Sequence, residues 1–165
     1  MGIDAWGHGL PADDGLVDIV ITTGAAFGFK PFITELLKDR ARDVDGDGAN
    51  DSGADYWTAY AFHTRDVVRQ SVSDHFQLVR VVRSFDGVNT WGLDQDDDGQ
   101  ADLAGDFNGD GVVDVGGPGN LIVITGVSLG GIVGSLAAAA EPDIVRAAPI
   151  AGGGGLSDIA VRCLQ

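Results

Sequence analysis

The 165-residue chain carries a net charge of −15, because 25 acidic residues outnumber ten lysines and arginines. This charge argues against nucleic acid and anionic membranes as partners. No apolar run approaches the length of a transmembrane segment, and the first residues lack the pattern of a signal peptide. The single Cys163 excludes an internal disulfide framework. A hydrophobic fraction of 44% is enough for one packed domain.

The first third of the chain predicts few elements clearly. Residues 1–10 are typical of a strand end that runs into a loop. The apolar segment 16–22 fits either a short strand or a buried helix, and periodicity alone does not decide between them. Residues 31–43 predict a helix, with Pro31 in its first turn.

Residues 63–84 form the strongest predicted helix. We expect Thr64 to cap it and Asp66 to occupy its first turn, where a negative charge is favourable. One apolar stripe recurs at helical spacing. It consists of Val68, Val72, Phe76, Val79 and Val82.

The last third predicts a parallel βαβ unit. Residues 121–125 are continuously apolar, as central strands of parallel sheets are. Residues 129–140 predict a helix that Pro142 stops, and 144–152 predict the next strand. A crossover helix between two strands implies a parallel sheet, so the expected fold class is α/β with helices on both faces of the sheet.

Three segments repeat one aspartate-rich pattern, named here the first (43–51), second (94–102) and third (106–114) Asp loops. Oxygen side chains at positions 1, 3, 5 and 9 with a glycine at position 6 predict loops that wrap Ca²⁺. The backbone carbonyl at position 7 supplies a further ligand. The predicted side-chain ligands are Asp43, Asp45, Asp47, Asp51 and Asp55; Asp94, Asp96, Asp98 and Asp102; and Asp106, Asn108, Asp110 and Asp114.

The Asp loops lack the bidentate glutamate that closes an EF-hand at position 12. Asp55 and Asp106 lie one residue further and are candidates to replace it. The loops therefore resemble the short calcium loops of dockerins and thrombospondin type 3 repeats. Solvated acidic turns are the alternative interpretation, although three repeats in register favour a structural role for calcium.

The stretch GVSLGG, residues 126–131, places Ser128 between a predicted strand and a predicted helix. That arrangement is typical of a nucleophile elbow, in which the backbone N–H of the following residue, here Leu129, helps to hold an oxyanion. A glycine-rich turn that packs tightly or binds phosphate is the alternative. No Walker lysine or GxGxxG motif accompanies the stretch.

On these motifs, the chain resembles an internal piece of an α/β-hydrolase of the bacterial esterase and lipase type. LIVITGVSLGGIVGSLAAAAEP is similar to strand 5, the elbow and helix C of that fold, and IVRAAPIAGGGGL to strand 6. TRDVVRQSVSDHFQLVRVV occupies the place of helix B, and GIDAWGHGLP resembles the exit from strand 4. The resemblance makes residues 1–165 one incomplete hydrolase domain, with 43–55 and 94–117 as calcium-loop insertions.

The resemblance also implies where the catalytic partners of Ser128 belong. In this fold the triad runs serine, then acid, then histidine along the chain. His8, His63 and His75 all precede Ser128. We therefore expect the acid and the histidine outside this chain, in the remainder of the hydrolase domain, and we expect these 165 residues alone to be inactive. On this view His8 is structural.

The expected function is hydrolysis of a carboxylic ester, small or lipid, by Ser128. The alternatives are a non-catalytic calcium-binding surface protein on a hydrolase-like scaffold and a pseudo-enzyme that lacks the histidine. Loops of this kind fill best where calcium is millimolar. That preference indicates an extracellular, periplasmic or bacterial cell-surface location.

Overall fold

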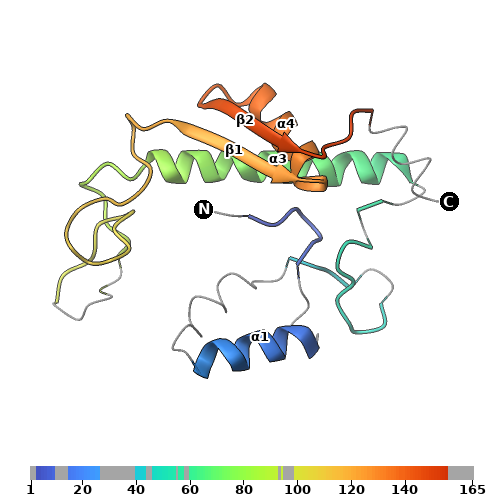
Figure 1. The fold of residues 1–165 in the computed structure, drawn as a ribbon, viewed down its shortest axis with the longest axis horizontal. Coiled ribbons are helices and arrows are strands. Elements are labelled where there is room, and N and C mark those ends of the chain that lie inside the picture. Colours follow the sequence, from blue (N-terminus) through green and yellow to red (C-terminus); the bar gives the residue numbers. More distant parts are fainter. Residues whose placement is uncertain are drawn as a thin grey trace. The chain divides into compact units, whose positions relative to one another are not determined.

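The computed structural model describes residues 3–9, 15–26, 40–43, 46–54, 56–57, 60–92, 94 and 99–155 (Figure 1). The chain divides into two compact units, Met1–Ser71 with Gly153–Gln165 and Val72–Gly152. In the described residues it is a small α/β structure with three helices and a two-stranded parallel sheet. None of these helices is long and apolar enough to cross a membrane.

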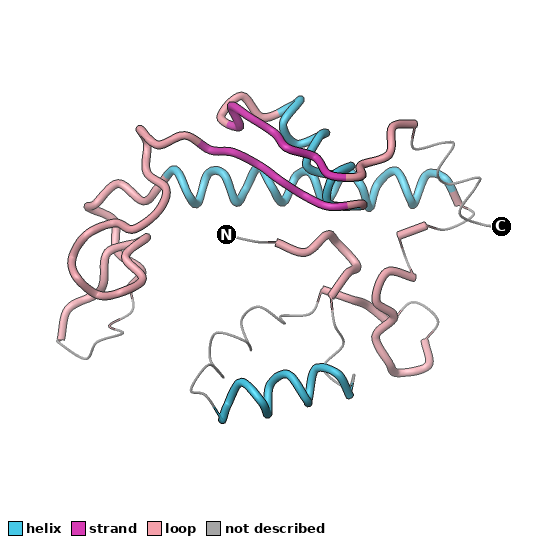
Figure 2. The backbone as a smooth tube through the Cα atoms, in the orientation of Figure 1, coloured by secondary structure: helices cyan, strands magenta, loops and turns pink. Residues whose placement is uncertain are grey.

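The second unit contains the parallel βαβ motif that the sequence predicts (Figure 2). β1 (Ile122–Val127) pairs in parallel with β2 (Ile144–Ile150), and α4 (Leu129–Ala140) is the crossover. The bounds of α4 are those predicted. β1 extends two residues beyond the predicted strand, so Ser128 follows it directly.

The core of the second unit lies on one face of this sheet. Ile122 and Ile124 of β1 pack against a cluster made by Val79, Ala137 and Ile144. Successive strand residues point to opposite faces. On the other face, Val123 and Val127 are 56% and 63% exposed. Within the described residues both packed helices therefore cover the same face, and the prediction of helices on both faces is not met there.

α3 (Ala61–Arg83) carries the predicted apolar stripe, and this prediction is confirmed. Val68 and Val79 are buried, and Val72 and Phe76 pack against the core of the second unit. The helix begins two residues earlier than predicted.

This early start makes the predicted cap wrong. The carbonyl of Tyr60 accepts the N–H groups of both His63 (3.0 Å) and Thr64 (3.2 Å), so the first turn closes before Thr64. Thr64 is buried inside the helix, and no acidic residue, Asp66 included, stands in the first turn.

The first unit departs further from expectation. The ambiguous segment 16–22 is helical and belongs to α1 (Gly15–Ala26). Residues 3–9 form turns and not a strand end, because the Ala5 carbonyl accepts the His8 N–H (3.0 Å). The predicted helix over 31–43 lies mostly outside the described residues, and its last four residues are not helical.

Candidate functional site

Ser128 occupies a strained backbone position between β1 and α4. Its φ is 54° and its ψ is −115°, in a region that residues with a side chain rarely adopt. Its N–H donates to the carbonyl of Ile150 (2.9 Å), and its carbonyl accepts from the N–H of Ile132 (3.1 Å). Such conformations persist only where surrounding contacts hold them, and they cluster at functional sites. Ser128 is exposed.

Two glycines of GVSLGG stand where an added side chain would meet nearby backbone. A Cβ on Gly126 would lie 2.3 Å from the carbonyl oxygen of Gly130, because the turn at Ser128 brings the chain back on itself. A Cβ on Gly131 would lie 3.0 Å from the Cα of Gly152, beyond β2. Gly130 has open space around its Cβ position. The small residues of this motif therefore serve close backbone approach, as an elbow requires.

The surroundings of Ser128 are only partly those of a catalytic triad. Its hydroxyl makes no hydrogen bond to any of the described residues. His75 lies on α3 in the same unit as Ser128, whereas His8 and His63 belong to the other unit. Leu129 is the first residue of α4, where backbone N–H groups have no partner within the helix. The structure therefore places the Leu129 N–H, the predicted oxyanion donor, beside the serine. A histidine partner for Ser128 stays a prediction.

The third Asp loop is held together by carboxylates that accept backbone N–H groups. The two oxygens of Asp106 accept from Gly109 and Gly111, both at 2.8 Å. Asp110 accepts from Val112 at 2.9 Å. These bonds join positions 1 to 4, 1 to 6 and 5 to 7 of the pattern.

The first Asp loop repeats this geometry. Asp43 accepts from Gly46 (2.7 Å) and from Gly48 (3.0 Å), and Asp47 accepts from Ala49 (2.8 Å). The same three pairs of positions are thus joined in both loops. The repeat seen in the sequence therefore corresponds to one repeated turn structure.

The second Asp loop shares the bond from position 1 to position 6, where Asp94 accepts from Gly99 at 2.9 Å. It closes where the Trp91 N–H donates to the Asp102 carbonyl (3.0 Å). Four of the predicted ligands lie outside the described residues: Asp45, Asp55, Asp96 and Asp98.

The donor types of the Asp loops suit a hard cation, but the described carboxylates do not converge. In the part of the chain that the structure describes, no three His, Cys, Asp or Glu side chains form a group that could hold a metal ion. This holds for the third Asp loop, of which every predicted ligand is described. There Asn108 Nδ2 instead donates to Asp110 Oδ2 (3.2 Å). Calcium binding thus stays a prediction.

Among the described acidic residues of the Asp loops, Asp106 is buried, at 2% exposure. Burial by itself raises the pKa of its carboxyl, but the backbone N–H groups of Gly111, Gly109 and Asn108 lower it. Together they hold the pKa of Asp106 below its ordinary value. The carboxylate is therefore charged at neutral pH.

His8 is packed into the first unit. Its ring meets Tyr56 edge-on with centroids 5.2 Å apart, and a Cβ on Gly53 would lie 2.9 Å from the ring. Burial raises the pKa of the Tyr56 phenol. The segment 3–9 is joined to the residues that follow the first Asp loop, because the Gly53 N–H donates to the Gly7 carbonyl (2.9 Å). These contacts suit the structural role that the sequence predicts for His8.

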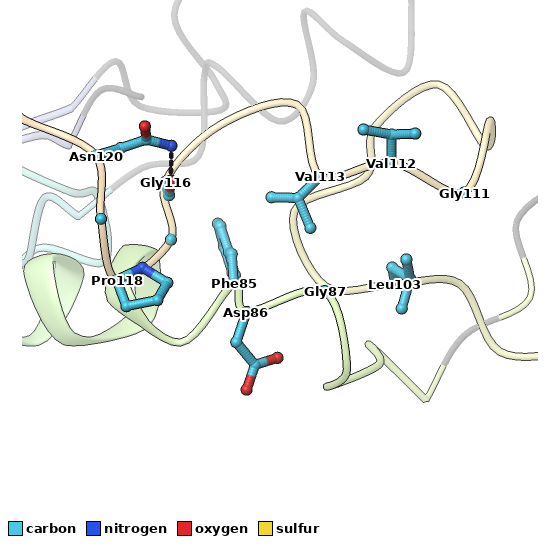
Figure 3. A pocket seen from close by; sticks show the side chains of 12 residues that line it. Phe85, Asp86, Gly87, Leu103, Gly111, Val112, Val113, Gly116, Pro118 and Asn120 are labelled. Atoms are coloured by element: carbon cyan, nitrogen blue, oxygen red, sulfur yellow. Dashed lines mark hydrogen bonds between the residues drawn. The ribbon is translucent and has the colours of Figure 1, made fainter.

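An open groove of about 410 Å³ borders the third Asp loop (Figure 3). Phe85, two residues after the end of α3, lines it together with Val113 and Pro118. Asn120 donates to the Gly116 carbonyl along its edge. Ser128 is not among the lining residues.

Sequence patterns did not single out Ala151. This residue follows β2 directly and has a φ of 51°. Ser128 and Ala151 are the non-glycine residues with positive φ in the described part of the chain. Alanine is common everywhere, so no residue type marks this position in advance.

No protein family model matches this chain, and no curated protein or solved structure matches it either. The resemblance to α/β-hydrolases therefore remains a prediction from sequence motifs.

Proposed function

We propose that this protein is a serine hydrolase that cleaves carboxylic esters through Ser128. The observation that carries the proposal is the backbone of Ser128, with φ 54° and ψ −115° directly after β1 and directly before α4. An exposed serine held in a strained strand-to-helix turn is what nucleophilic attack requires. The Gly126 and Gly130 backbones meet closely enough to explain why the turn is built from small residues.

In the proposed mechanism, Ser128 Oγ attacks the acyl carbonyl, the ester C–O bond breaks, and the alcohol leaves with a proton from the catalytic histidine. Water then hydrolyses the acyl-enzyme, which releases the carboxylic acid and restores the Ser128 hydroxyl. The Leu129 N–H, at the start of α4, stabilises the negative charge on the carbonyl oxygen. A histidine oriented by an acid takes the serine proton. The three histidines of this sequence all precede Ser128, whereas in the hydrolase triad the histidine follows the serine, so the proposal assigns the acid and the histidine to other residues than these.

The test is covalent labelling of the full-length protein with a fluorophosphonate probe. We expect labelling of the wild type, and we expect Ser128→Ala to abolish it because the nucleophile is removed. Ser73→Ala is the matched control, since Ser73 is an exposed serine on α3. Labelling that persists in Ser128→Ala, or a wild type that is not labelled, contradicts the proposal.

The second candidate function is calcium binding without catalysis, on the same scaffold. The observation that favours it is the bond from position 1 to position 6, which recurs as Asp43–Gly48, Asp94–Gly99 and Asp106–Gly111. The two functions are compatible, and in a hydrolase the calcium would be structural. Experiment distinguishes the two functions, because a protein that binds calcium and is never labelled at Ser128 supports only calcium binding without catalysis.

Calcium binding by the Asp loops would also bear on location. Such loops are filled where calcium is millimolar, so the proposal places the protein outside the cytoplasm, in the periplasm, at the cell surface or in the medium. A small or lipid ester is the proposed substrate class. The charge of −15 disfavours strongly anionic substrates.

A further inference from the structure

The turn that leaves β2, residues 150–152, lies next to the turn that carries Ser128. β1 and β2 are paired so that Val127 lies opposite Ile150. Ser128 and Ala151 are therefore the first residues after two paired strand ends. Both have positive φ, 54° and 51°, although neither is glycine. Two such outliers on neighbouring strand ends indicate that one local arrangement imposes both conformations.

Two backbone contacts connect residues 150–152 with the elbow. The Ser128 N–H donates to the Ile150 carbonyl at 2.9 Å, although β1 ends at Val127. The second contact is between glycines, because a Cβ on Gly152 would lie 2.9 Å from the carbonyl carbon of Gly131. Gly131 is buried in the first turn of α4. The exit of β2 thus touches the elbow at two points, the Ser128 N–H and the Gly131 backbone.

We propose that residues 150–152 position the nucleophile, with Ala151 and Gly152 as positioning residues. The Ile150 carbonyl holds the Ser128 backbone in its strained conformation. Ala151 adopts the left-handed conformation that turns the chain after Ile150 and brings Gly152 against Gly131, at the start of α4. That contact sets where α4 begins, and so where Ser128 and the Leu129 N–H lie relative to each other. This inference rests on the proposed function of Ser128.

The first experiment compares Gly152→Ala with Gly154→Ala. Gly154 is the matched control, because a Cβ there has nothing within 4 Å. The added methyl of Gly152→Ala overlaps the Gly131 backbone and displaces the start of α4. We expect the maximal rate of phosphonate labelling to fall by about 100-fold while the affinity for the probe is unchanged, because a displacement of about 1 Å can cost that much. Gly154→Ala should label like the wild type.

Two substitutions of Ala151, one permissive and one restrictive, test its positioning role. Glycine adopts a φ of 51° freely, so Ala151→Gly should keep the wild-type labelling rate. A β-branched side chain is strongly disfavoured there, so Ala151→Val should lower the rate as Gly152→Ala does. Equal rates for Ala151→Val and Ala151→Gly would overturn the positioning role.

Hydrogen exchange at the Ser128 amide separates this inference from the proposed function. Its N–H is bonded to Ile150, so it should be protected in the wild type, in Gly154→Ala and in Ala151→Gly. It should exchange faster in Gly152→Ala. If the wild type is not labelled, the proposed function fails, and the exchange data still decide whether residues 150–152 hold Ser128. If the wild type is labelled and Gly152→Ala matches Gly154→Ala in both measurements, this inference fails alone.

Discussion

The Ser128 elbow and the third Asp loop both turn the backbone sharply, and they do so by different means. At the elbow the turn is held by contacts between main chains, with Gly126 against Gly130 and Gly131 against Gly152. In the loop it is held by a side chain, since the Asp106 carboxylate accepts N–H groups from Gly109 and Gly111.

Because the two turns are held differently, different perturbations should change their stability. The elbow stores strain in φ and ψ and contains no titratable group, so it should respond to added volume. The Asp loops are stabilised by charge–dipole bonds and carry repelling carboxylates, so they should respond to cations. The predictions below test this contrast.

The largest expected effect is that of Gly126→Ala. The new methyl would lie 2.3 Å from the Gly130 oxygen, which neither backbone can avoid without moving. We expect the free energy of unfolding to fall by about 3 kcal/mol, the upper range for overpacking. Urea unfolding measures it.

Gly130→Ala is the control for that substitution, one turn further along the same motif. Nothing lies within 4 Å of its Cβ position, and the residue is helical. We expect it to raise stability by about 0.4–1 kcal/mol. Equal losses in the two variants would mean that volume is not what the elbow resists.

The second largest expected effect is the stabilisation of the protein by calcium. If the Asp loops bind it, free calcium at about 100 times the dissociation constant should add about 2.7 kcal/mol to stability, and a chelator should remove it. Thermal melts with and without calcium measure this. Asp106→Asn should reduce the shift, because it removes one charged ligand from one of three loops.

Asp86→Asn is the control for calcium, since Asp86 lies outside all three loops and should leave the shift unchanged. The elbow variant Gly130→Ala should leave it unchanged as well. A wild type whose melting temperature does not move in millimolar calcium would reduce the loops to acidic turns.

The smallest expected effect is the pH dependence of Asp86. The N–H groups of Asn89 and Val88 lower the pKa of its carboxyl in the folded state. Its contribution to stability is therefore present above the unfolded pKa of about 3.9, and it is lost as the pH falls through the lower folded pKa. Melting temperatures of wild type and Asp86→Asn should differ near pH 6 and converge toward about pH 2. The offset caused by Gly130→Ala should not change with pH, and a constant Asp86 offset would contradict the prediction.

The predictions from sequence were most accurate for features that a local residue pattern controls. The βαβ unit, the bounds of α4 and the stripe on α3 follow from hydrophobic periodicity and from Pro142. The start of α3 was missed because Tyr60, which carries no capping signal, supplies the carbonyl that closes its first turn. The turns of residues 3–9 were missed because the bond from the His8 N–H to the Ala5 carbonyl joins main-chain atoms, which no residue type marks in advance.

By itself the sequence determined that a serine stands between a buried strand and a small-residue helix, and that three aspartate patterns repeat in register. Spacing and residue type are local properties, so they are visible without a fold. Only the tertiary structure decided that Ser128 is strained, that Ala151 is strained beside it, and that Gly152 meets Gly131. Those features depend on the backbone conformation at the ends of β1 and β2, which hydrophobic periodicity does not specify even where it predicts that the two strands pair.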